Sequence, residues 1–231
     1  MLKKVIFIPV GSHEYHGDLL PPNTDSIIAS RVAKDLSEQI KNSRLLPTMN
    51  YGVSLEHADY ESTVTVDSSS YLSFMSKLFD SISADDSLIV IINGHGGNVN
   101  ILGVLESEYN YKHSNSKVFV SSIFNNKMKL VCEDLFGEFD SHAGSVESSL
   151  LSYYGQIDKD DVTLQNEAFI KKMPSSLHYF RMKQVNEAGV IKDTSNLVIN
   201  SRLGNKLNKA IVEELKSQIN SLLKDINKVI G

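Results

Sequence analysis

The stretch Leu88–Ile92 places five apolar residues in succession. A strand with one solvated face alternates apolar and polar residues, whereas a strand in a parallel sheet is covered on both faces and reads as a continuous apolar run. Parallel strands also need crossover connections, which are usually helices. Leu88–Ile92 therefore predicts a central parallel strand in a chain that alternates strands with helices.

Strand and helix signals do alternate along the 231 residues. Runs rich in β-branched and aromatic residues predict strands, and apolar residues at helical spacing predict helices. The predicted strands are Lys4–Val10, a short strand near Leu45 and Leu46, Leu88–Ile92 and Val118–Ile123. The predicted helices run from Asn23 or Thr24 to Ile40, from Asp67 or Ser68 to Ile82, from Asn98 or Asn100 to Tyr109, over Ser145–Tyr154 and over Leu203–Ile230. This order predicts one α/β domain over residues 1–231, a three-layer α/β/α sandwich with a mainly parallel central sheet.

The least periodic part of the chain is the segment 156–200. Within it, Asn186–Ile199 contains two short apolar runs and is predicted to form a small hairpin or a loop. The segment carries no linker composition that would require a second domain, and it is expected to line a pocket.

Composition excludes several classes of function. The net charge of -5 gives no basic surface of the kind that nucleic-acid binding requires, so no nucleic-acid partner is expected. No apolar run approaches the roughly 20 residues that span a membrane, and the apolar start of the chain predicts a core strand rather than a signal peptide. The single cysteine, Cys132, cannot form an internal disulfide, which favours a reducing compartment such as the cytoplasm. Its expected role is that of a small core residue.

Acidic and histidine side chains follow the first predicted strand and open the helix after it. Glu14 and His16 are two positions apart, so in extended backbone they project to the same side. They lie at the carboxyl end of the strand, the edge where ligands usually bind in open α/β sheets. Asp25 falls in the first helical turn, where the helix dipole favours a carboxylate. The alternatives are a solvated loop for Glu14 and His16 and a plain helix-start charge for Asp25.

The segment Asn93–Asn98 follows the buried strand and contains three glycines and His95. Glycines let the backbone turn sharply and approach a ligand closely, and the next helix directs free N–H groups into the same space. We therefore expect His95 to face a pocket. The alternative is a tight connection, or a turn that binds a phosphate.

The last such segment places His142 just before a predicted helix that carries Glu147 in its first turn. Both side chains are expected to face one cavity, with a helix-capping segment and an incidental histidine as the alternative. His57, His113 and His178 have no comparable neighbours in the sequence. We expect His113 and His178 to be ordinary surface or core residues.

Taken together, these segments resemble the motifs of the creatininase family of metal-dependent amidohydrolases. The matching stretches are Gly11-Ser12-His13-Glu14-Tyr15-His16-Gly17, Leu20-Pro21, Asn23-Thr24-Asp25, Asn93-Gly94-His95-Gly96-Gly97-Asn98 and His142-Ala143-Gly144-Ser145-Val146-Glu147. Tyr51–His57 is similar to a further Tyr-Gly, Ser and Glu-His stretch of the family. Order and spacing agree over about residues 5–155, so the family's fold and chemistry are expected here.

The resemblance implies a binuclear site for two divalent ions, and zinc, manganese and iron(II) all accept its mixed nitrogen and oxygen ligands. Glu14 and His95 would bind one ion, His16 and Glu147 the other, and Asp25 would bridge the two. The implied catalytic residues are His142, which would carry a proton, and Glu147. The implied substrate-binding residues are Gly94, Gly96, Gly97 and Asn98, whose N–H groups would hold an oxyanion or an anionic substrate.

Two features favour a substrate other than creatinine. Creatinine-hydrolysing members carry Tyr-Glu in place of Gly96-Gly97 and use tryptophans, of which this chain has none. The Gly-Gly form resembles members that remove formate from a ribosylated aminopyrimidine phosphate or trim the precursor peptide of a redox cofactor. We expect hydrolysis of a non-peptide amide, formamide or cyclic amide, with a formamidopyrimidine nucleotide favoured over creatinine and over a precursor peptide.

Readings from other classes also stay open. A non-catalytic binding protein on the same fold would leave the intact set of ligands unexplained. A nucleotide-phosphate-binding domain that uses only the glycine turn would leave Glu14, His16 and His142 unexplained. The resemblance further implies a small-molecule substrate and a homo-oligomer.

Overall fold

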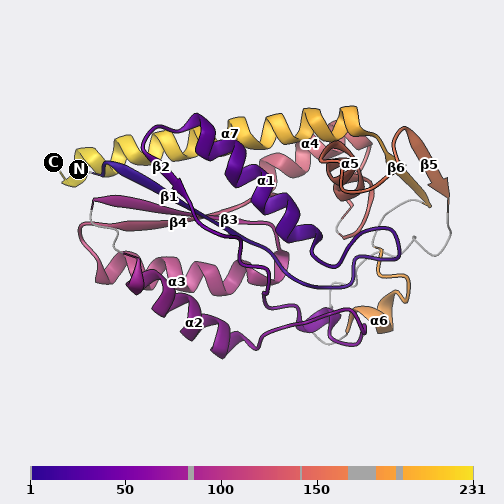
Figure 1. The fold of residues 1–231 in the computed structure, drawn as a ribbon, viewed down its shortest axis with the longest axis horizontal. Helices are drawn as coiled ribbons and strands as arrows, with labels where there is room; N and C mark the ends of the chain where they lie inside the picture. The colour runs from indigo at the N-terminus through magenta and orange to yellow at the C-terminus, as the bar shows by residue number, and fades with distance from the viewer. Residues whose placement is uncertain (1, 83–85, 141, 166–180, 191–194, 231) are drawn as a thin grey trace.

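The core of the fold is a four-stranded parallel sheet with the strand order β2-β1-β3-β4 (Figure 1). The computed structural model describes residues 2–82, 86–140, 142–165, 181–190 and 195–230. The strands are β1 (Lys4–Val10), β2 (Ser43–Leu45), β3 (Ser87–Asn93) and β4 (Lys117–Ser122). All four predicted strands are therefore confirmed, and the register that pairs Val10 with Asn93 makes β1 and β3 end side by side.

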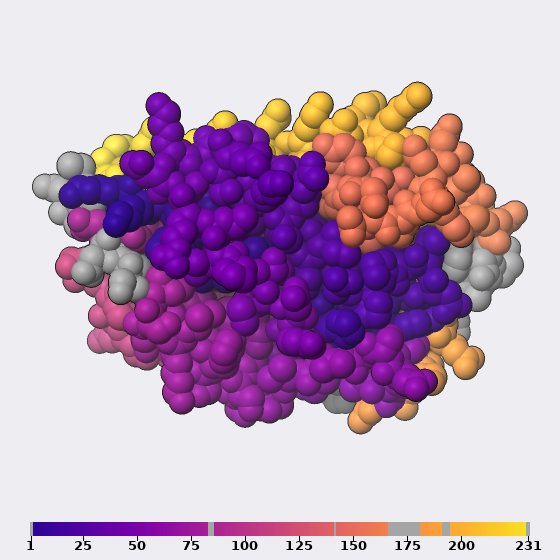
Figure 2. Space-filling model, viewed as in Figure 1, coloured from indigo at the N-terminus to yellow at the C-terminus, as the bar shows by residue number. Residues whose placement is uncertain are grey.

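Helices cover both faces of this sheet, which confirms the predicted three-layer α/β/α architecture (Figure 1). One face is covered by α2 (Ser68–Ser81) and α3 (Val99–Lys112). The other is covered by α1 (Thr24–Gln39), α4 (Asn126–Phe136), α5 (Ser145–Tyr153) and α7 (Ser201–Ile230). In the space-filling view, segments from the first half of the chain form most of the visible face and α7 runs along its upper edge (Figure 2).

The two faces of the sheet belong to two separate apolar cores. Phe7, Val90 and Ile92 pack on the side of α1 and α7, whereas Ile8 and Ile91 pack on the side of α2 and α3. Successive strand residues point to opposite faces, so a strand between two helical layers must be apolar at every position. This explains the unbroken apolar run of β3, whose side chains are fully buried from Leu88 to Ile92.

Helix starts follow the capping signals only in part. Asp67 caps α2 as predicted, because its carboxylate accepts hydrogen bonds from the N–H groups of Ser69 and Ser70 at 3.1 and 3.0 Å. Asn23 precedes α1, but its side chain makes no capping hydrogen bond. Helix α4 was not predicted. Asn125 caps it, and Cys132 is fully buried on its inner face as the expected small core residue.

The aperiodic segment contributes a small second sheet. Strand β6 (Asn196–Ile199) pairs antiparallel with β5 (Val162–Gln165), and α6 (Met182–Val185) lies between them in sequence. For Asn186–Ile199 the prediction was a small hairpin or a loop, and among its described residues β6 forms no hairpin within the segment, since it pairs with β5, more than 30 residues earlier in the chain. Residues 191–194 of that predicted element lie outside the described residues.

Helix α7 confirms the predicted long amphipathic helix. Its inner face places Leu207, Ile211 and Leu215 in the core with no exposed surface. Near its end the side-chain oxygen of Asn227 accepts a hydrogen bond of 2.6 Å from the N–H of Leu2, so the start of the chain is tied to the last helix. Among the helices of the described residues, none is both long and apolar enough to cross a lipid bilayer.

We expect Gly204→Ala to destabilise the protein by about 1–3 kcal/mol. A Cβ on Gly204 of α7 would lie 2.0 Å from the backbone oxygen of Ser149 on α5, so the two helices would have to separate. The matched control is Gly103→Ala on α3, where a Cβ meets no atom within 4 Å. The control should gain about 0.5–1 kcal/mol from helix propensity. Chemical denaturation measures both, and equal effects would contradict the close packing.

Candidate active site

The candidate site lies at the carboxyl edge of the sheet, between β1 and β3. The chain passes from β1 to β2 on one side and then returns to β3 on the other, so the strand order reverses at this point. Ligands of open α/β sheets bind at such a reversal. The residues that follow the two strands include Glu14, His16 and His95, all of which are buried.

Gly94 brings the end of β3 against the start of α1. A Cβ at this position would lie 2.5 Å from the backbone oxygen of Asp25, closer than any side chain allows. A glycine is therefore required for this approach. The contact places His95, the next residue, beside the Asp25 carboxylate.

Asp25 is shared between two histidines. Its Oδ1 lies 3.2 Å from Nε2 of His16, and its Oδ2 lies 2.9 Å from Nδ1 of His95. The hydroxyl of Ser12 donates a hydrogen bond of 2.8 Å to Oδ2 and fixes the carboxylate between the two rings. A carboxylate held in this way can bridge two cations.

Glu14 reaches the same cluster from the loop after β1. Its Oε2 lies 3.3 Å from Nε2 of His95, and its Oε1 lies 3.8 Å from both Nε2 of His57 and Nδ1 of His142. Oε2 is buried and accepts no hydrogen bond from the described residues. A buried carboxylate oxygen without a donor is costly, and coordination of a cation would remove that cost.

Helix α5 supplies the third carboxylate. Glu147 lies in its first turn, with Oε2 at 2.7 Å from the N–H of Ala143 and 4.0 Å from Nε2 of His16. Asp140 holds the start of this helix by accepting hydrogen bonds from the N–H groups of Ser145 and Val146. The same short segment therefore contains both a residue that caps the helix, Asp140, and a candidate metal ligand, Glu147.

The ring of His142 is fixed by the backbone. Its Nε2 donates a hydrogen bond of 2.8 Å to the carbonyl oxygen of Tyr15, which leaves Nδ1 facing Glu14. The ring lies 4.4 Å from those of His16 and His57, measured between centroids. Burial and the charges of His16 and His57 lower the pKa of His142 to about 3, so the ring is neutral.

The cluster brings three carboxylates and four histidines together in a buried space. Burial opposes ionisation of His16, but Asp25, Glu147 and Glu14 outweigh it and raise the pKa of His16 to about 10. Burial and the charges of Asp25 and Asp140 raise the pKa of Glu147 to about 8, even though His16 acts in the opposite direction. Three carboxylates at such distances need positive charge beside them, which divalent cations supply.

Ligand atoms from these residues form three groups that could each hold an ion. The groups are Glu14, Asp25 and His95; His16, His142 and Glu147; and Glu14, His57 and His142. Within each group the ligand atoms lie within 4.8 Å of one another. The first two groups contain every predicted metal ligand. Asp25 of the first group contacts His16 of the second, so the two groups adjoin.

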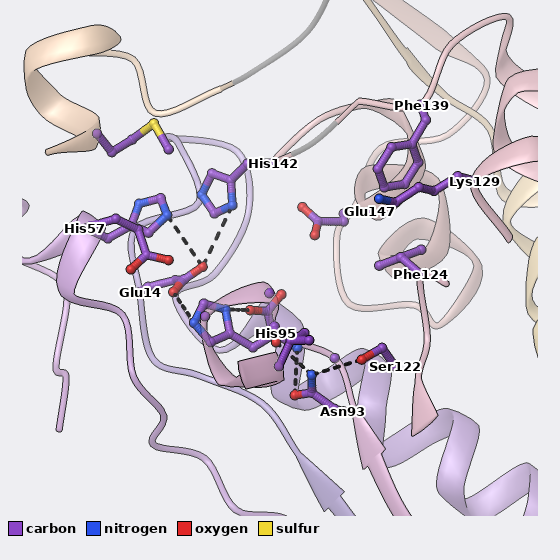
Figure 3. A pocket seen from close by; sticks show the side chains of 17 residues that line it. Glu14, His57, Asn93, His95, Ser122, Phe124, Lys129, Phe139, His142 and Glu147 are labelled. Carbon is purple, nitrogen blue, oxygen red and sulfur yellow. Dashed lines mark hydrogen bonds and ion pairs between the residues drawn. The ribbon is translucent and has the colours of Figure 1, made fainter. Parts of the chain in front are cut away.

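A cavity of about 350 Å³ opens onto the cluster. Glu14, His57, His95, His142 and Glu147 line it on the metal-ligand side, as Figure 3 shows. Small-molecule sites commonly span about 300–1,000 Å³, so this cavity suits a compact ligand.

The glycine turn divides into a lining part and a supporting part. The backbones of Gly94, Gly96 and Gly97 line the cavity, as their predicted contact with substrate requires. Asn98 does not line it, because its side chain is fully buried behind the turn. Its Oδ1 accepts a hydrogen bond from the N–H of Val53 and its Nδ2 donates one to the carbonyl of Gly11, both of 3.0 Å. The predicted substrate contact of Asn98 has no support in this geometry.

Sequence reasoning missed His57. Its surroundings in the sequence do not resemble those of the other candidate ligands, yet it is buried against Glu14 and its Nδ1 has no hydrogen-bond partner among the described residues. The available signal was the similarity of Tyr51–His57 to a family stretch. His113 is remote from the site, and its ring stacks on that of Tyr109 with 4.0 Å between centroids. His178 lies outside the described residues.

Comparisons with known proteins show which family the chain resembles. A family model described as creatininase, creatinine amidohydrolase, matches residues 2–219. A mycofactocin precursor peptide peptidase of Mycolicibacterium smegmatis is 28% identical over 82% of this chain and 74% of its own length. The 2-amino-5-formylamino-6-ribosylaminopyrimidin-4(3H)-one 5'-monophosphate deformylase of Methanothermus fervidus is 30% identical over 96% of this chain and 83% of its own length.

Solved structures show the same fold. A creatininase mutant in complex with creatine superposes with a TM-score of 0.75 at 19% identity, over 94% of this chain and 91% of that one. Creatininase structures described as a Zn-Zn type and as a Mn form give TM-scores of 0.69 and 0.70 at 19% and 20% identity, over 94% of this chain and 90% of each of theirs.

We expect Asn98→Ala to lower stability by about 2 kcal/mol or more, because it leaves the buried N–H of Val53 and the carbonyl of Gly11 without partners. Asn100→Ala is the matched control, since Asn100 is exposed on α3 and should change stability by less than about 0.5 kcal/mol. Thermal unfolding compares the two variants. If the Asn98→Ala protein has normal stability but binds substrate more weakly, the result would support the predicted contact between Asn98 and substrate instead.

Proposed function

We propose that this chain, which belongs to the creatininase family of metal-dependent amidohydrolases, uses two divalent ions to hydrolyse the amide or formamide bond of a small substrate. The observation that carries the proposal is the position of Asp25 between His16 and His95, beside Glu14 and Glu147. An apolar core would not contain three buried carboxylates around two histidines, and a helix start exposed to solvent would not bury them.

The donor set fits a pair of ions. Glu14, Asp25 and His95 would hold one ion. His16 and Glu147 would hold the other, and Asp25, whose Oδ1 lies 3.2 Å from Nε2 of His16, would be shared between the two. Nitrogen and carboxylate oxygen ligands of this kind accept zinc, manganese or iron(II). When bound, the ions lower the pKa of a water molecule and polarise the carbonyl of the substrate.

His142 is the proposed proton carrier. Its Nε2 is committed to the carbonyl of Tyr15, so Nδ1 is the atom that can take up a proton and pass it to the departing nitrogen. The backbone N–H groups of Gly96 and Gly97, which line the cavity, are the proposed donors to the oxygen that gains charge. The burial of His142 lowers the dielectric around its ring and strengthens its electrostatic interactions.

A formamidopyrimidine nucleotide is the favoured substrate. The relative named as a deformylase of such a nucleotide matches nearly the whole chain. The cavity of about 350 Å³ also suits a compact ligand better than an extended peptide. Release of formate from the nucleotide, lost on chelation and restored by zinc or manganese, is the direct test. Activity on creatinine alone would overturn this choice.

A peptidase is the second candidate, favoured by the 28% identity to the mycofactocin precursor peptide peptidase. The same residues would then act on a peptide bond near the end of a chain, since only a chain end fits the cavity. Cleavage of a precursor peptide without formate release would establish this function instead.

We expect Asp25→Ala to reduce bound metal from two ions per chain to one or none and to abolish hydrolysis, because each carboxylate oxygen faces a different histidine. Asp80→Ala is the control, since Asp80 is exposed on α2 and pairs with His113. Elemental analysis of the purified proteins measures metal directly. An unchanged metal content in Asp25→Ala would refute the bridging role.

We expect His142→Gln to keep its metal content while kcat falls by about 10²–10⁴. Glutamine can still donate to the carbonyl of Tyr15 but cannot carry a proton. Steady-state kinetics and elemental analysis on the same preparation separate the two roles. Loss of an ion in this variant would make His142 a ligand rather than a proton carrier.

A further inference from the structure

The wall of the cavity opposite His57 and His142 has a different chemistry from the metal-ligand side. Lys129 of α4 and the aromatic residues Phe124 and Phe139 lie together there, with Glu147 between them and the histidines (Figure 3). The described residues of that wall have no part in the proposed hydrolysis.

Lys129 is the only lysine or arginine among the described residues that line the cavity. Its ammonium group lies 5.5 Å from the centre of the Phe139 ring. Lys127, two residues earlier, is instead paired with Glu214 of α7 and does not line the cavity. The other side of the cavity carries Glu14, Asp25 and Glu147. A lysine beside a ring, across the cavity from these carboxylates, is placed to bind an anion that they would repel.

The two aromatic rings make an apolar surface next to this cation. The centres of Phe124 and Phe139 are 5.9 Å apart, with ring planes at 53°. Both residues are half-buried, so part of each ring remains free to contact a ligand. Planar rings pack favourably on such surfaces.

We propose that Lys129 binds an anionic group of the substrate and that Phe124 and Phe139 contact its planar ring. The site then selects amides of ring compounds that carry an anion, which for the favoured substrate are the pyrimidine and its phosphate. This inference rests on the proposed function, because the amide must reach the metal-ligand side while the anion meets Lys129. These residues determine specificity and take no part in bond cleavage.

The test compares Lys129→Met, Lys129→Arg and Lys127→Met. With a formamidopyrimidine nucleotide, Lys129→Met should raise KM by about 10- to 100-fold at nearly constant kcat, since a charge-assisted hydrogen bond is lost. With the nucleoside that lacks the phosphate, KM should not change. Lys129→Arg should recover most of the affinity, and Lys127→Met should behave as wild type with both substrates.

A second measurement is independent of turnover. Binding of uridine 5′-monophosphate and of uridine is measured by calorimetry, and Lys129→Met should remove the preference for the phosphorylated ligand. If this preference depends on Lys129 while no amide is hydrolysed, the inference stands and the proposed function fails. If formate is released equally well by wild type and Lys129→Met at all concentrations, the inference fails and the proposed function stands.

A third measurement distinguishes a phosphate from a carboxylate as the anionic group that Lys129 binds. A short peptide that ends in tyrosine carries the same combination of ring and anion, with a carboxylate in place of the phosphate. Dependence of peptide cleavage on Lys129, with no effect on the nucleotide, would assign the anion to a peptide terminus and overturn the nucleotide as the ligand.

Discussion

The contact between Gly94 and the backbone of Asp25 is the constraint on which the site depends. It fixes how deeply the start of α1 sits against the end of β3, and it does so through backbone atoms rather than through movable side chains. Because β1 and β3 end in register, the loop that carries Glu14 and His16 is held at the same level. Helix α1 thus meets two strand ends at one point, and Asp25 is the residue at that point.

The polar groups behind the site serve the same purpose. Asn98 joins the segment after β1 to the segment at Val53 through its amide, in a place where no strand pairing is available. Ser12 and Asp140 direct Asp25 and the start of α5 in the same manner. Buried polar groups that are fully satisfied hold one arrangement. The buried carboxylates of Glu14 and Asp25, by contrast, are partnered by His16 and His95, whose pKa values they raise.

Much of the fold could be read from periodicity. Leu88–Ile92 predicted a doubly covered strand, and Asp67 predicted a cap, because each signal is local. Helix α4 shows a missed local signal, since Asn125 precedes apolar residues at helical spacing. Strand β5 carried no usable signal, because it is short and exposed and its partner lies far along the chain.

The sequence predicted that six residues of the site lie together, but it did not predict the position of His57 or the role of Asn98. Glu14, His16, Asp25, His95, His142 and Glu147 do meet at one edge, as strand ends in a parallel sheet should. His57 ends a single 3-10 turn, Leu55–His57, whose position depends on tertiary contacts, so periodicity could not place it. Asn98 looked like a pocket residue from its motif, and only the path of the segment at Val53 shows that its amide is already used.

The absence of a side chain at Gly204 has a consequence beyond stability. Helix α5 rests on α7 at Ser149, which is two residues after Glu147 in the same short helix. A short helix moves as a rigid unit, so a displacement of α5 at Ser149 would also displace Glu147. The spacing between Glu147 and His16 is therefore set in part by a residue that touches neither substrate nor ligand atoms. Helix α7 limits how far α5 can move, so substitutions along α7 at this contact can change the position of the Glu147 carboxylate.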